Sequence, residues 1–114
     1  MADCLFCKII NRDIPASIVY EDDQMLAFND IDPKAPTHVL LIPKRHMPSL
    51  LDLGPGDESL VGELVKRAAA IARERGIAAG GFRTVFNTNA DAGQTVAHIH
   101  LHLLGGRPMH WPPG

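Results

Sequence analysis

Three histidines within five residues carry the strongest chemical signal in the sequence. His98, His100 and His102 alternate with the apolar residues Ile99 and Leu101. Alternation with a period of two is typical of a β-strand, whose successive side chains point to opposite faces. The pattern predicts that the three imidazoles share one face of a strand, spaced about 6.6 Å apart along it.

Such a row of imidazoles is compatible with three roles. It can be the solvent-facing side of a half-buried sheet, although Thr, Lys or Glu is more usual there. Neutral imidazole is also the commonest metal ligand, so two neighbouring rings can share an ion. Finally, imidazole is basic and nucleophilic near neutral pH and can form a covalent intermediate in group transfer.

The residues just before the histidines favour the third role. Gly93 permits a tight turn, and the Gln94 amide and Thr95 hydroxyl add hydrogen-bonding groups. Backbone N–H groups gathered in a turn form a nest that can hold an anion. A phosphate bound there would lie beside the imidazoles, which suggests phosphoryl or nucleotidyl transfer through a covalent histidine.

The totals of the chain indicate a single globular domain over residues 1–114. A net charge of −2 gives no reason to expect strong nucleic-acid binding. No apolar run reaches the roughly 18 residues of a membrane span, and no basic stretch followed by an apolar one marks a secretory signal. Two cysteines are too few for a disulfide framework and fit a reducing compartment, so we expect a cytoplasmic protein.

The elements that must position these groups can be read from periodicity and turn residues. Hairpins dominate the order and one long amphipathic helix interrupts them, which predicts an α+β domain with an antiparallel five-stranded sheet. We expect a short helix over 4–11, strands over 18–21, 25–28, 38–43 and 82–87, a helical turn near 49–53, a long helix over about 57–75, and the histidine strand.

The long helix has a clear inner and outer side. Glu63 and Arg67 are spaced to pair on its exposed side, and Gly76 lies where a helix-ending glycine is expected. The stripe predicted to pack on the sheet comprises Leu60, Leu64, Ala68 and Ile71, with Val61, Val65 and Ala72 beside it.

The segment from His98 to Leu104 resembles the His-φ-His-φ-His-φ-φ signature of the histidine triad (HIT) superfamily, where φ is an apolar residue. The segments 30–38, 42–46 and 105–114 resemble the histidine triad nucleotide-binding (Hint) branch, so the resemblance covers nearly the whole chain. It implies the HIT fold and hydrolysis of purine nucleoside phosphoramidates, of the AMP-NH2 and AMP-lysine type.

The resemblance also implies a role for individual residues. His100 would attack the α-phosphorus to form a nucleotidyl-histidine, which water converts to AMP or GMP. His102 would contact a phosphate oxygen, Thr95 (more often Ser in the family) would assist the leaving group, and His38 would be a fourth histidine near the nucleophile. The implied nucleotide-binding residues are Phe28 and Ile31 at the base, Asp30 at the ribose hydroxyls, and Asn87, Gly93, Gln94, Thr95, His100 and His102 around the phosphate.

Some of these residues have simpler interpretations. Phe28 and Ile31 suit an ordinary core, Asn87 suits a turn at a strand end, and His38 suits a structural position at a strand start. These alternatives stay open from sequence alone.

No cofactor is implied for catalysis, but some Hint-like proteins carry a structural zinc ion. The corresponding residues are Cys4, Cys7, His46 and His98, a Cys₂His₂ set suited to Zn²⁺. The alternative is that the two cysteines are small buried apolar groups. The family also forms homodimers, and Trp111 would then reach the active site of the neighbouring subunit.

Two further functions remain alternatives to the phosphoramidase. One is a nucleotide-binding regulatory or scaffold protein whose hydrolysis is incidental, although a binder has no need of His100. The other is a dinucleoside polyphosphate hydrolase, against which the tail 105–114 argues.

Overall fold

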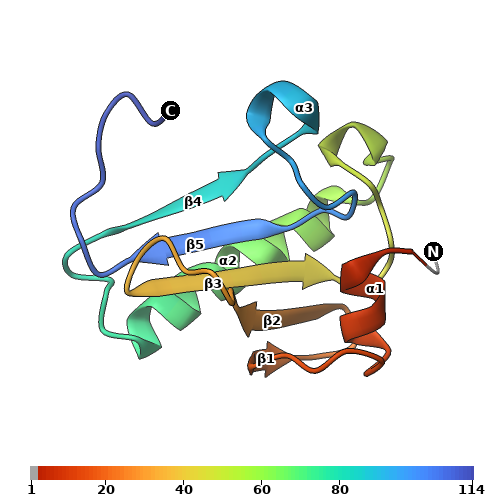
Figure 1. Ribbon diagram of the computed structural model, residues 1–114, viewed down its shortest axis with the longest axis horizontal. Coiled ribbons are helices and arrows are strands. Elements are labelled where there is room, and N and C mark those ends of the chain that lie inside the picture. Colours follow the sequence, from red (N-terminus) through yellow and green to blue (C-terminus); the bar gives the residue numbers. More distant parts are fainter. Residues whose placement is uncertain (1–2) are drawn as a thin grey trace.

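The computed structural model describes residues 3–114. The chain forms one five-stranded antiparallel sheet in the order β1-β2-β3-β5-β4, as Figure 1 shows. This confirms the predicted α+β class and the number of strands. The elements are α1 (Leu5–Ile10), β1 (Ile18–Glu21), β2 (Met25–Asn29), β3 (Thr37–Pro43), the 3₁₀ turn η1 (Leu50–Asp52), α2 (Glu58–Glu74), β4 (Phe82–Phe86), α3 (Asn89–Ala92) and β5 (Leu101–Gly105).

Strand alternation divides the core into two layers, one on each face of the sheet. Strand β3 lies at the centre and is buried along its whole length, as its continuous apolar run predicts. The layer against α2 contains Met25, Ala27, Val39, Leu41, Leu64, Ala68, Ile71, Ala72, Leu101 and Leu103. The layer against α1 contains Phe6, Ile9, Leu26, Phe28, Leu40 and Ile42.

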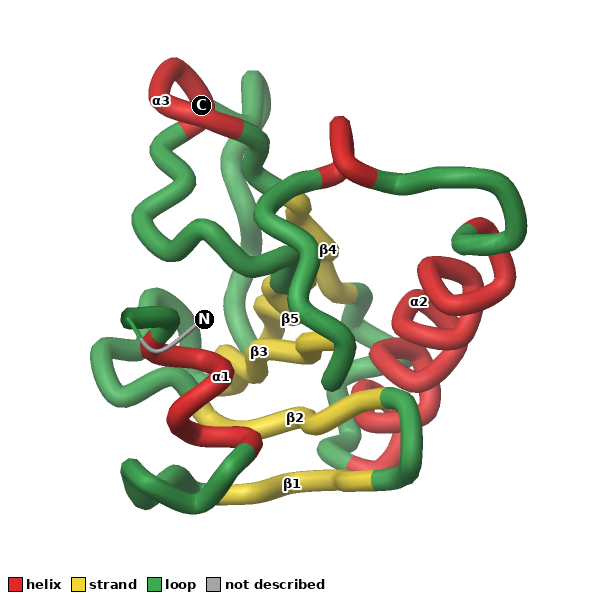
Figure 2. The backbone as a smooth tube through the Cα atoms, turned by 90° about the vertical axis from the view of Figure 1, so that its right-hand side faces the viewer, coloured by secondary structure: helices red, strands yellow, loops and turns green. Residues whose placement is uncertain are grey.

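The two covering helices differ greatly in length. Helix α2 has 17 residues, whereas α1 has 6 and spans only about 9 Å. Figure 2 shows the two helices on opposite sides of the sheet. Because α1 covers only part of its face, the neighbouring part of β3 and β5 can present polar side chains to a pocket.

Helix α2 has the predicted ends, but two of its predicted contacts are wrong. Its C-terminal cap is Arg75, and Gly76 follows with a φ of 75°. Val65, predicted to face the sheet, is 46% exposed. Arg67 does not pair with Glu63: its guanidinium lies 3.8 Å from the centre of the Tyr20 ring, a cation–π contact with the first strand.

The histidine strand is shorter than predicted. Strand β5 begins at Leu101, so only His102 of the three histidines lies within it. Pairing with β3 reaches no further than Leu101, opposite Leu41. The prediction that all three histidines lie in one strand is therefore wrong, although His98 and His100 both contact Phe6 of α1.

A short helix that the sequence did not predict lies before the histidines. Residues 88–93, expected to be a loop, contain the four-residue α3, which Gly93 ends with a φ of 81°. Within residues 3–114 no helix combines the length and apolarity that a membrane crossing requires.

Candidate functional site

The ring of His100 is oriented by a backbone carbonyl. Its Nδ1 lies 2.8 Å from the carbonyl oxygen of His98, and a carbonyl only accepts, so Nδ1 carries the proton. The lone pair is therefore on Nε2, which makes no hydrogen bond in the described structure. Since no fully buried side-chain nitrogen or oxygen of residues 3–114 lacks a partner, Nε2 must reach the surface of the pocket.

A phenylalanine from α1 fixes the same ring from the side. The rings of Phe6 and His100 meet edge to face, with centres 5.1 Å apart and planes at 82°. Phe6 meets the rings of Phe28 and His98 in the same way. Such contacts are favourable and restrict ring rotation. Phe6 was not predicted as a site residue, because only its place beside Cys7 marks it and its ring partners are distant in sequence.

His102 and His38 form a pair of contacting imidazoles beside His100. They lie on adjacent strands, two register positions apart, because His102 is opposite Leu40 and His38 opposite Leu104. His38 Nε2 lies 2.9 Å from His102 Nδ1 and 3.5 Å from Asp30 Oδ2. The structure thus brings the predicted fourth histidine into contact with the triad.

Both imidazoles of this pair favour the neutral form. Burial lowers the pKa of His102 to about 4, with the neighbouring His100 and His38 adding to the effect. Burial also lowers the pKa of His38, which the Asp30 carboxylate partly offsets. The site therefore contains neutral rings, each with one donor and one acceptor nitrogen, at neutral pH.

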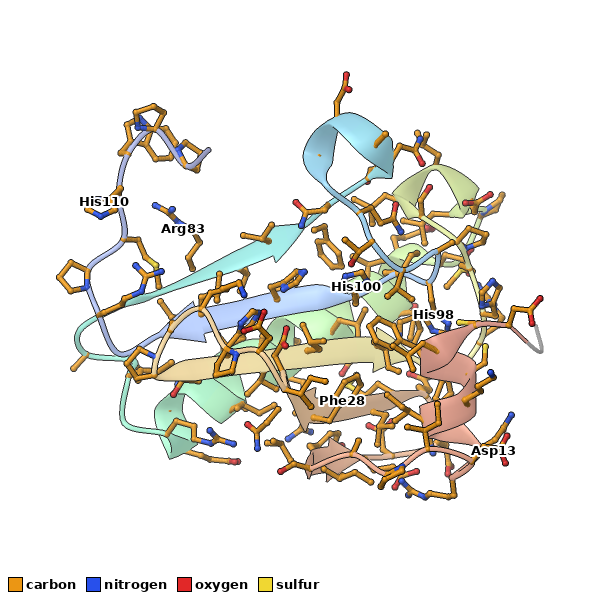
Figure 3. All side chains as sticks on the ribbon, in the orientation of Figure 1. Asp13, Phe28, Arg83, His98, His100 and His110 are labelled. Atoms are coloured by element: carbon orange, nitrogen blue, oxygen red, sulfur yellow. The ribbon has the colours of Figure 1, made fainter. Side chains whose placement is uncertain are left out.

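These groups open into a cavity of about 250 Å³ between α1 and the sheet. Figure 3 shows His100 and Phe28 on the side of the sheet that α1 covers in part. Six of the predicted site residues line the cavity: Phe28, Asp30, Ile31, Thr95, His100 and His102. Apolar walls from α1 complete it, including Leu5, Phe6 and Ile9. The arrangement suits a flat apolar group near α1 and a polar, anionic group at the histidines.

Three predicted phosphate contacts do not line this cavity. Gly93 forms the end of α3, and Asn87 follows β4. The Gln94 side chain is already engaged: its Nε2 donates to the carbonyl oxygens of Pro48 and Val96, and its Oε1 accepts from the amide of Asn89. In this structure Gln94 ties together the loops before the histidines.

The third triad residue belongs to a separate cluster. His98 is fully buried and meets Cys4, Cys7 and His46, the complete predicted metal set. Its Nδ1 lies 3.4 Å from Cys4 Sγ, 3.7 Å from Cys7 Sγ and 3.1 Å from His46 Nδ1. His46 Nδ1 lies 3.3 Å from Cys7 Sγ.

The spacing of these four atoms fits a tetrahedral zinc site. Bonds of ordinary length to Zn²⁺ would separate a sulfur and a nitrogen by about 3.5 Å and two nitrogens by about 3.3 Å. The Nε2 of His98 lies 2.8 Å from the carbonyl oxygen of Pro43 and must donate to it, so the lone pair on Nδ1 points into the cluster. The chemistry of the donor set therefore fits the metal.

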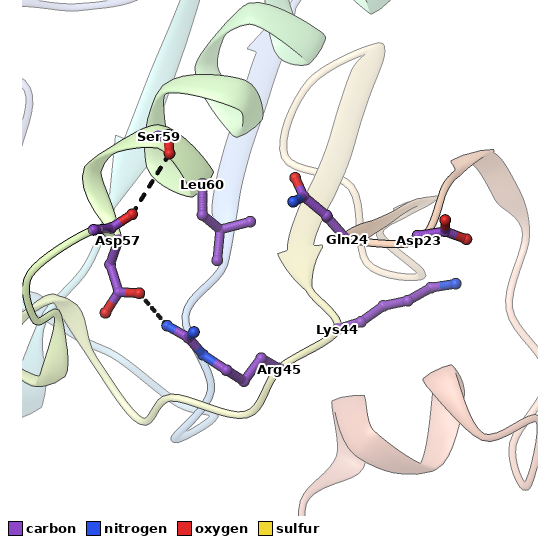
Figure 4. A pocket seen from close by; sticks show the side chains of 8 residues that line it. Asp23, Gln24, Lys44, Arg45, Asp57, Ser59 and Leu60 are labelled. Carbon is purple, nitrogen blue, oxygen red and sulfur yellow. Dashed lines mark hydrogen bonds and ion pairs between the residues drawn. The ribbon is translucent and has the colours of Figure 1, made fainter.

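Another hollow, which Figure 4 shows, lies between the turn before β2, the loop after β3 and the start of α2. Both of its basic side chains are already paired, Lys44 with Glu21 and Arg45 with Asp57. It therefore offers less to a ligand than the cavity at His100.

The C-terminal tail follows β5 and contacts the edge strand β4. Arg83 on β4 donates to the carbonyl oxygen of His110, and Figure 3 shows the two residues side by side. Trp111 is 82% exposed and does not line the cavity at His100.

Comparisons with known proteins agree with this geometry. The family described as scavenger mRNA decapping enzyme C-term binding matches residues 3–111. An uncharacterized HIT-like protein of Synechocystis is 55% identical over 98% of this chain and 97% of its own. The purine nucleoside phosphoramidase of Escherichia coli is 50% identical over 94% of this chain and 90% of its own. A HIT family hydrolase from Legionella pneumophila superposes with a TM-score of 0.96 at 52% identity, covering 98% of this chain and all of that one.

Proposed function

The chain belongs to the histidine triad (HIT) family and is an enzyme of its hydrolase type, and from this premise we propose that it hydrolyses purine nucleoside phosphoramidates through a covalent nucleotidyl-histidine. The substrate class rests on a relative of nearly equal length, 50% identical, that is named a purine nucleoside phosphoramidase.

One observation carries the proposed mechanism. The Nδ1–H of His100 is bound to the His98 carbonyl at 2.8 Å, so the lone pair of Nε2 faces the cavity. A nucleophile needs a free lone pair at the reacting atom, and a fixed ring lowers the entropy cost of attack. A protein that only binds nucleotides has no use for this arrangement.

The reaction then proceeds in two displacements. Nε2 of His100 attacks the α-phosphorus, a P–N bond forms to the ring, and the P–N bond to the leaving amine breaks as that amine takes up a proton. A water molecule next attacks the same phosphorus, loses a proton and releases the nucleoside monophosphate, which returns the electron pair to Nε2. Splitting one difficult hydrolysis into two easier steps is the purpose of covalent catalysis.

The other cavity residues fit the remaining parts of such a substrate. We assign the base to the apolar wall that includes Phe28 and Ile31, and the ribose hydroxyls to the Asp30 carboxylate. His102 would contact a phosphate oxygen, with His38 behind it, and the Thr95 hydroxyl would donate to the leaving group. Asn87, Gly93 and Gln94 lie outside the cavity lining and would act through the loop that carries Thr95.

We further propose that the four-residue cluster holds a structural zinc ion. Cys4, Cys7, His46 and His98 would supply all four ligands, which leaves no open position for a reacting molecule. When bound, the metal would fasten α1 to the loop after β3, which carries His46, and to the segment before β5, which carries His98. Both cysteines are free thiols, in keeping with a cytoplasmic location.

We propose that the protein is a homodimer. Strand β4 is an edge strand and carries Phe82, 38% exposed, and helix α2 exposes Val65. Pairing of two sheets through β4 would cover this edge and bring the exposed Trp111 toward the partner's cavity. Sedimentation equilibrium would give twice the chain mass; a monomer at micromolar concentration would overturn the proposal.

The decisive experiment follows the covalent step. Purified protein is mixed with adenosine 5′-phosphoramidate, quenched during turnover, and analysed by mass spectrometry for an added adenylyl group on His100. Rapid formation of AMP together with this adduct is expected. His100→Asn is the matched variant, because Asn keeps a donor near the His98 carbonyl but has no nucleophilic nitrogen.

Other outcomes identify the alternatives. Tight AMP binding without turnover of any phosphoramidate or dinucleotide would mark a nucleotide-binding regulatory protein. Faster cleavage of a dinucleoside polyphosphate than of the phosphoramidate would mark a polyphosphate hydrolase. Turnover that persists in His100→Asn would exclude His100 as the nucleophile.

A further inference from the structure

An exposed arginine outside the cavity contacts the loop that precedes β3. The guanidinium of Arg107 directs two nitrogens at one atom: Nε and Nη2 lie 3.1 and 2.9 Å from the carbonyl oxygen of Lys34. Its Nη1 donates to the carbonyl oxygen of Pro108 at 2.9 Å. Arg107 therefore spans two backbone segments, and its planar fork fixes the orientation of the Lys34 carbonyl.

Lys34 also contacts a histidine of the site, through its backbone N–H. The backbone N–H of Lys34 lies 3.1 Å from His38 Nδ1. A backbone amide only donates, so Nδ1 must be the acceptor and the proton of neutral His38 must be on Nε2. The Lys34 side chain takes no part in this contact, because its ammonium group bonds Asp32.

The tautomer of His38 in turn determines that of His102. His38 Nε2–H faces His102 Nδ1 at 2.9 Å, closer than Asp30 Oδ2 at 3.5 Å. Because His102 Nδ1 accepts this hydrogen, the proton of neutral His102 is on Nε2. Nε2 has no other protein partner within the described residues, and the ring lines the cavity, so this N–H points to the place of the substrate. Burial keeps both rings neutral by lowering their pKa values.

The tail approaches the loop too closely for this contact to be incidental. A Cβ atom at Gly106 would lie 2.9 Å from Pro36 Cβ, and the φ of Gly106 is 92°. Both the space and the backbone conformation therefore require glycine here. The close approach of residue 106 to Pro36 places the Arg107 side chain against Lys34.

We propose that Arg107 is a positioning residue that acts through the two peptide groups flanking the Lys34 Cα and through His38 to keep a hydrogen on Nε2 of His102, where it donates to a non-bridging phosphoryl oxygen. This extends the proposed function, since the phosphoryl acceptor belongs to the proposed substrate. With the opposite tautomer, a lone pair of His102 would face the negatively charged oxygens. Loss of Arg107 frees the peptide group between residues 34 and 35 to rotate. The backbone at Lys34 is then less restrained, and its N–H, which excludes that tautomer, is held less firmly against His38 Nδ1.

The test reads the tautomers directly. Nitrogen-15 NMR of histidine-labelled protein distinguishes a protonated ring nitrogen from one with a lone pair, and His102→Gln identifies the His102 signals. In the unaltered protein His102 should show protonated Nε2 and unprotonated Nδ1. In Arg107→Met both nitrogens should move toward intermediate shifts, and Arg107→Lys, which can restore one donor, should lie between.

Arg83→Met is the matched control. Arg83 also donates to a backbone carbonyl of the tail, that of His110, but this carbonyl has no connection to His38. Its removal should leave the His102 signals unchanged. Lys34→Met is a second control, because it alters the side chain and keeps the amide and carbonyl that make the contacts.

Steady-state kinetics gives a second, independent measurement. Arg107→Met should lower kcat for the phosphoramidate by on the order of tenfold, less than the loss of a donor that touches the substrate, while KM changes less. Unchanged His102 signals in folded Arg107→Met would overturn the proposal, as would equal changes in Arg83→Met. If Arg107→Met does not fold, the same criteria apply to Arg107→Lys and to Gly106→Ala, which displaces the tail.

The NMR result does not depend on turnover. A tautomer shift in a protein that cleaves no phosphoramidate would reject the proposed substrate and retain the positioning role. Phosphoramidase activity with no tautomer shift would retain the proposed substrate and reject the positioning role.

Discussion

Two histidine clusters lie side by side in this protein and use the same ring in opposite ways. In the buried cluster, His98 donates through Nε2 to Pro43 and directs its Nδ1 lone pair toward Cys4 and Cys7. In the cavity, His100 donates through Nδ1 and directs its Nε2 lone pair outward. The four ligand atoms around His98 suit a permanently bound metal, whereas the unpaired Nε2 of His100 suits attack on a substrate. The backbone group that takes the ring proton decides between the two roles.

The largest effects should come from removing one histidine from each cluster in turn. His100→Asn should lower kcat by about 10³-fold or more, because the nucleophile is lost, yet leave zinc content and unfolding temperature nearly unchanged. His98→Asn should instead lower zinc content and stability. Metal analysis, thermal unfolding and turnover of both variants check this separation. Equal losses of turnover and stability in the two variants would show that the clusters are not separate in function.

The metal cluster can be tested without touching the cavity. Stability should increase with free zinc, by about 2.7 kcal/mol at 100 times the dissociation constant. Cys7→Ser should abolish this dependence, since an alcohol is a poor zinc ligand. Unfolding in urea at several zinc concentrations measures the effect. A stability that does not respond to zinc or to a chelator would contradict the assignment. Ser59→Ala, at an exposed position of α2, serves as the control.

Acid should weaken the cavity cluster in a defined pH range. The pKa of His102 is lowered from 6.5 to about 4 by burial and by the nearby His100 and His38, while the Asp30 carboxylate partly offsets this. Between these values the unfolded chain binds a proton that the native protein does not, so the free energy of unfolding decreases as the pH falls from about 6.5 to about 4. His38 contributes in the same direction. Urea unfolding across this range should show a shallower decrease in His102→Gln, and identical slopes would reject the assignment.

The smallest expected effect concerns the residue between the two clusters. Thr95 lines the cavity at His100 and also a groove beside Cys4 and His46. Thr95→Ser keeps the hydroxyl and should change kcat by no more than about twofold, whereas Thr95→Ala should lower it by roughly tenfold if the hydroxyl donates to the leaving group. Zinc binding should be the same in both. Equal rates for the serine and alanine variants would remove the hydroxyl from the mechanism.

Much of the fold was predictable because it depends on local patterns. The helix over 57–75 and the strands around 18–21, 25–28, 38–43 and 82–87 all occur within one or two residues of their predicted bounds. The turn between the first two strands is local as well: Asp22 accepts from the amides of Gln24 and Met25. Failures arose where a distant contact outweighed the local pattern, as when Arg67 turned to Tyr20 instead of Glu63.

The candidate site was predictable as a list of residues more than as an arrangement. His100, His102 and Asp30 line one cavity, and His38 contacts His102 and Asp30. Cys4, Cys7, His46 and His98 meet in one cluster. The contribution of Phe6 and the contacts of Lys34 and Arg107 had no signal in the sequence, because a backbone amide belongs to every residue and arginine is common on surfaces.

By itself the sequence determined which chemistry the chain can carry and which face of each strand is apolar, because both follow from residue type and from a period of two. Only the tertiary structure decided what each ring does. The proton of His98 is fixed by a carbonyl 55 residues away, and that of His102 by a histidine 64 residues away. A tautomer depends on the single partner that each nitrogen meets, and those partners come together only when β3, β5 and their loops have packed.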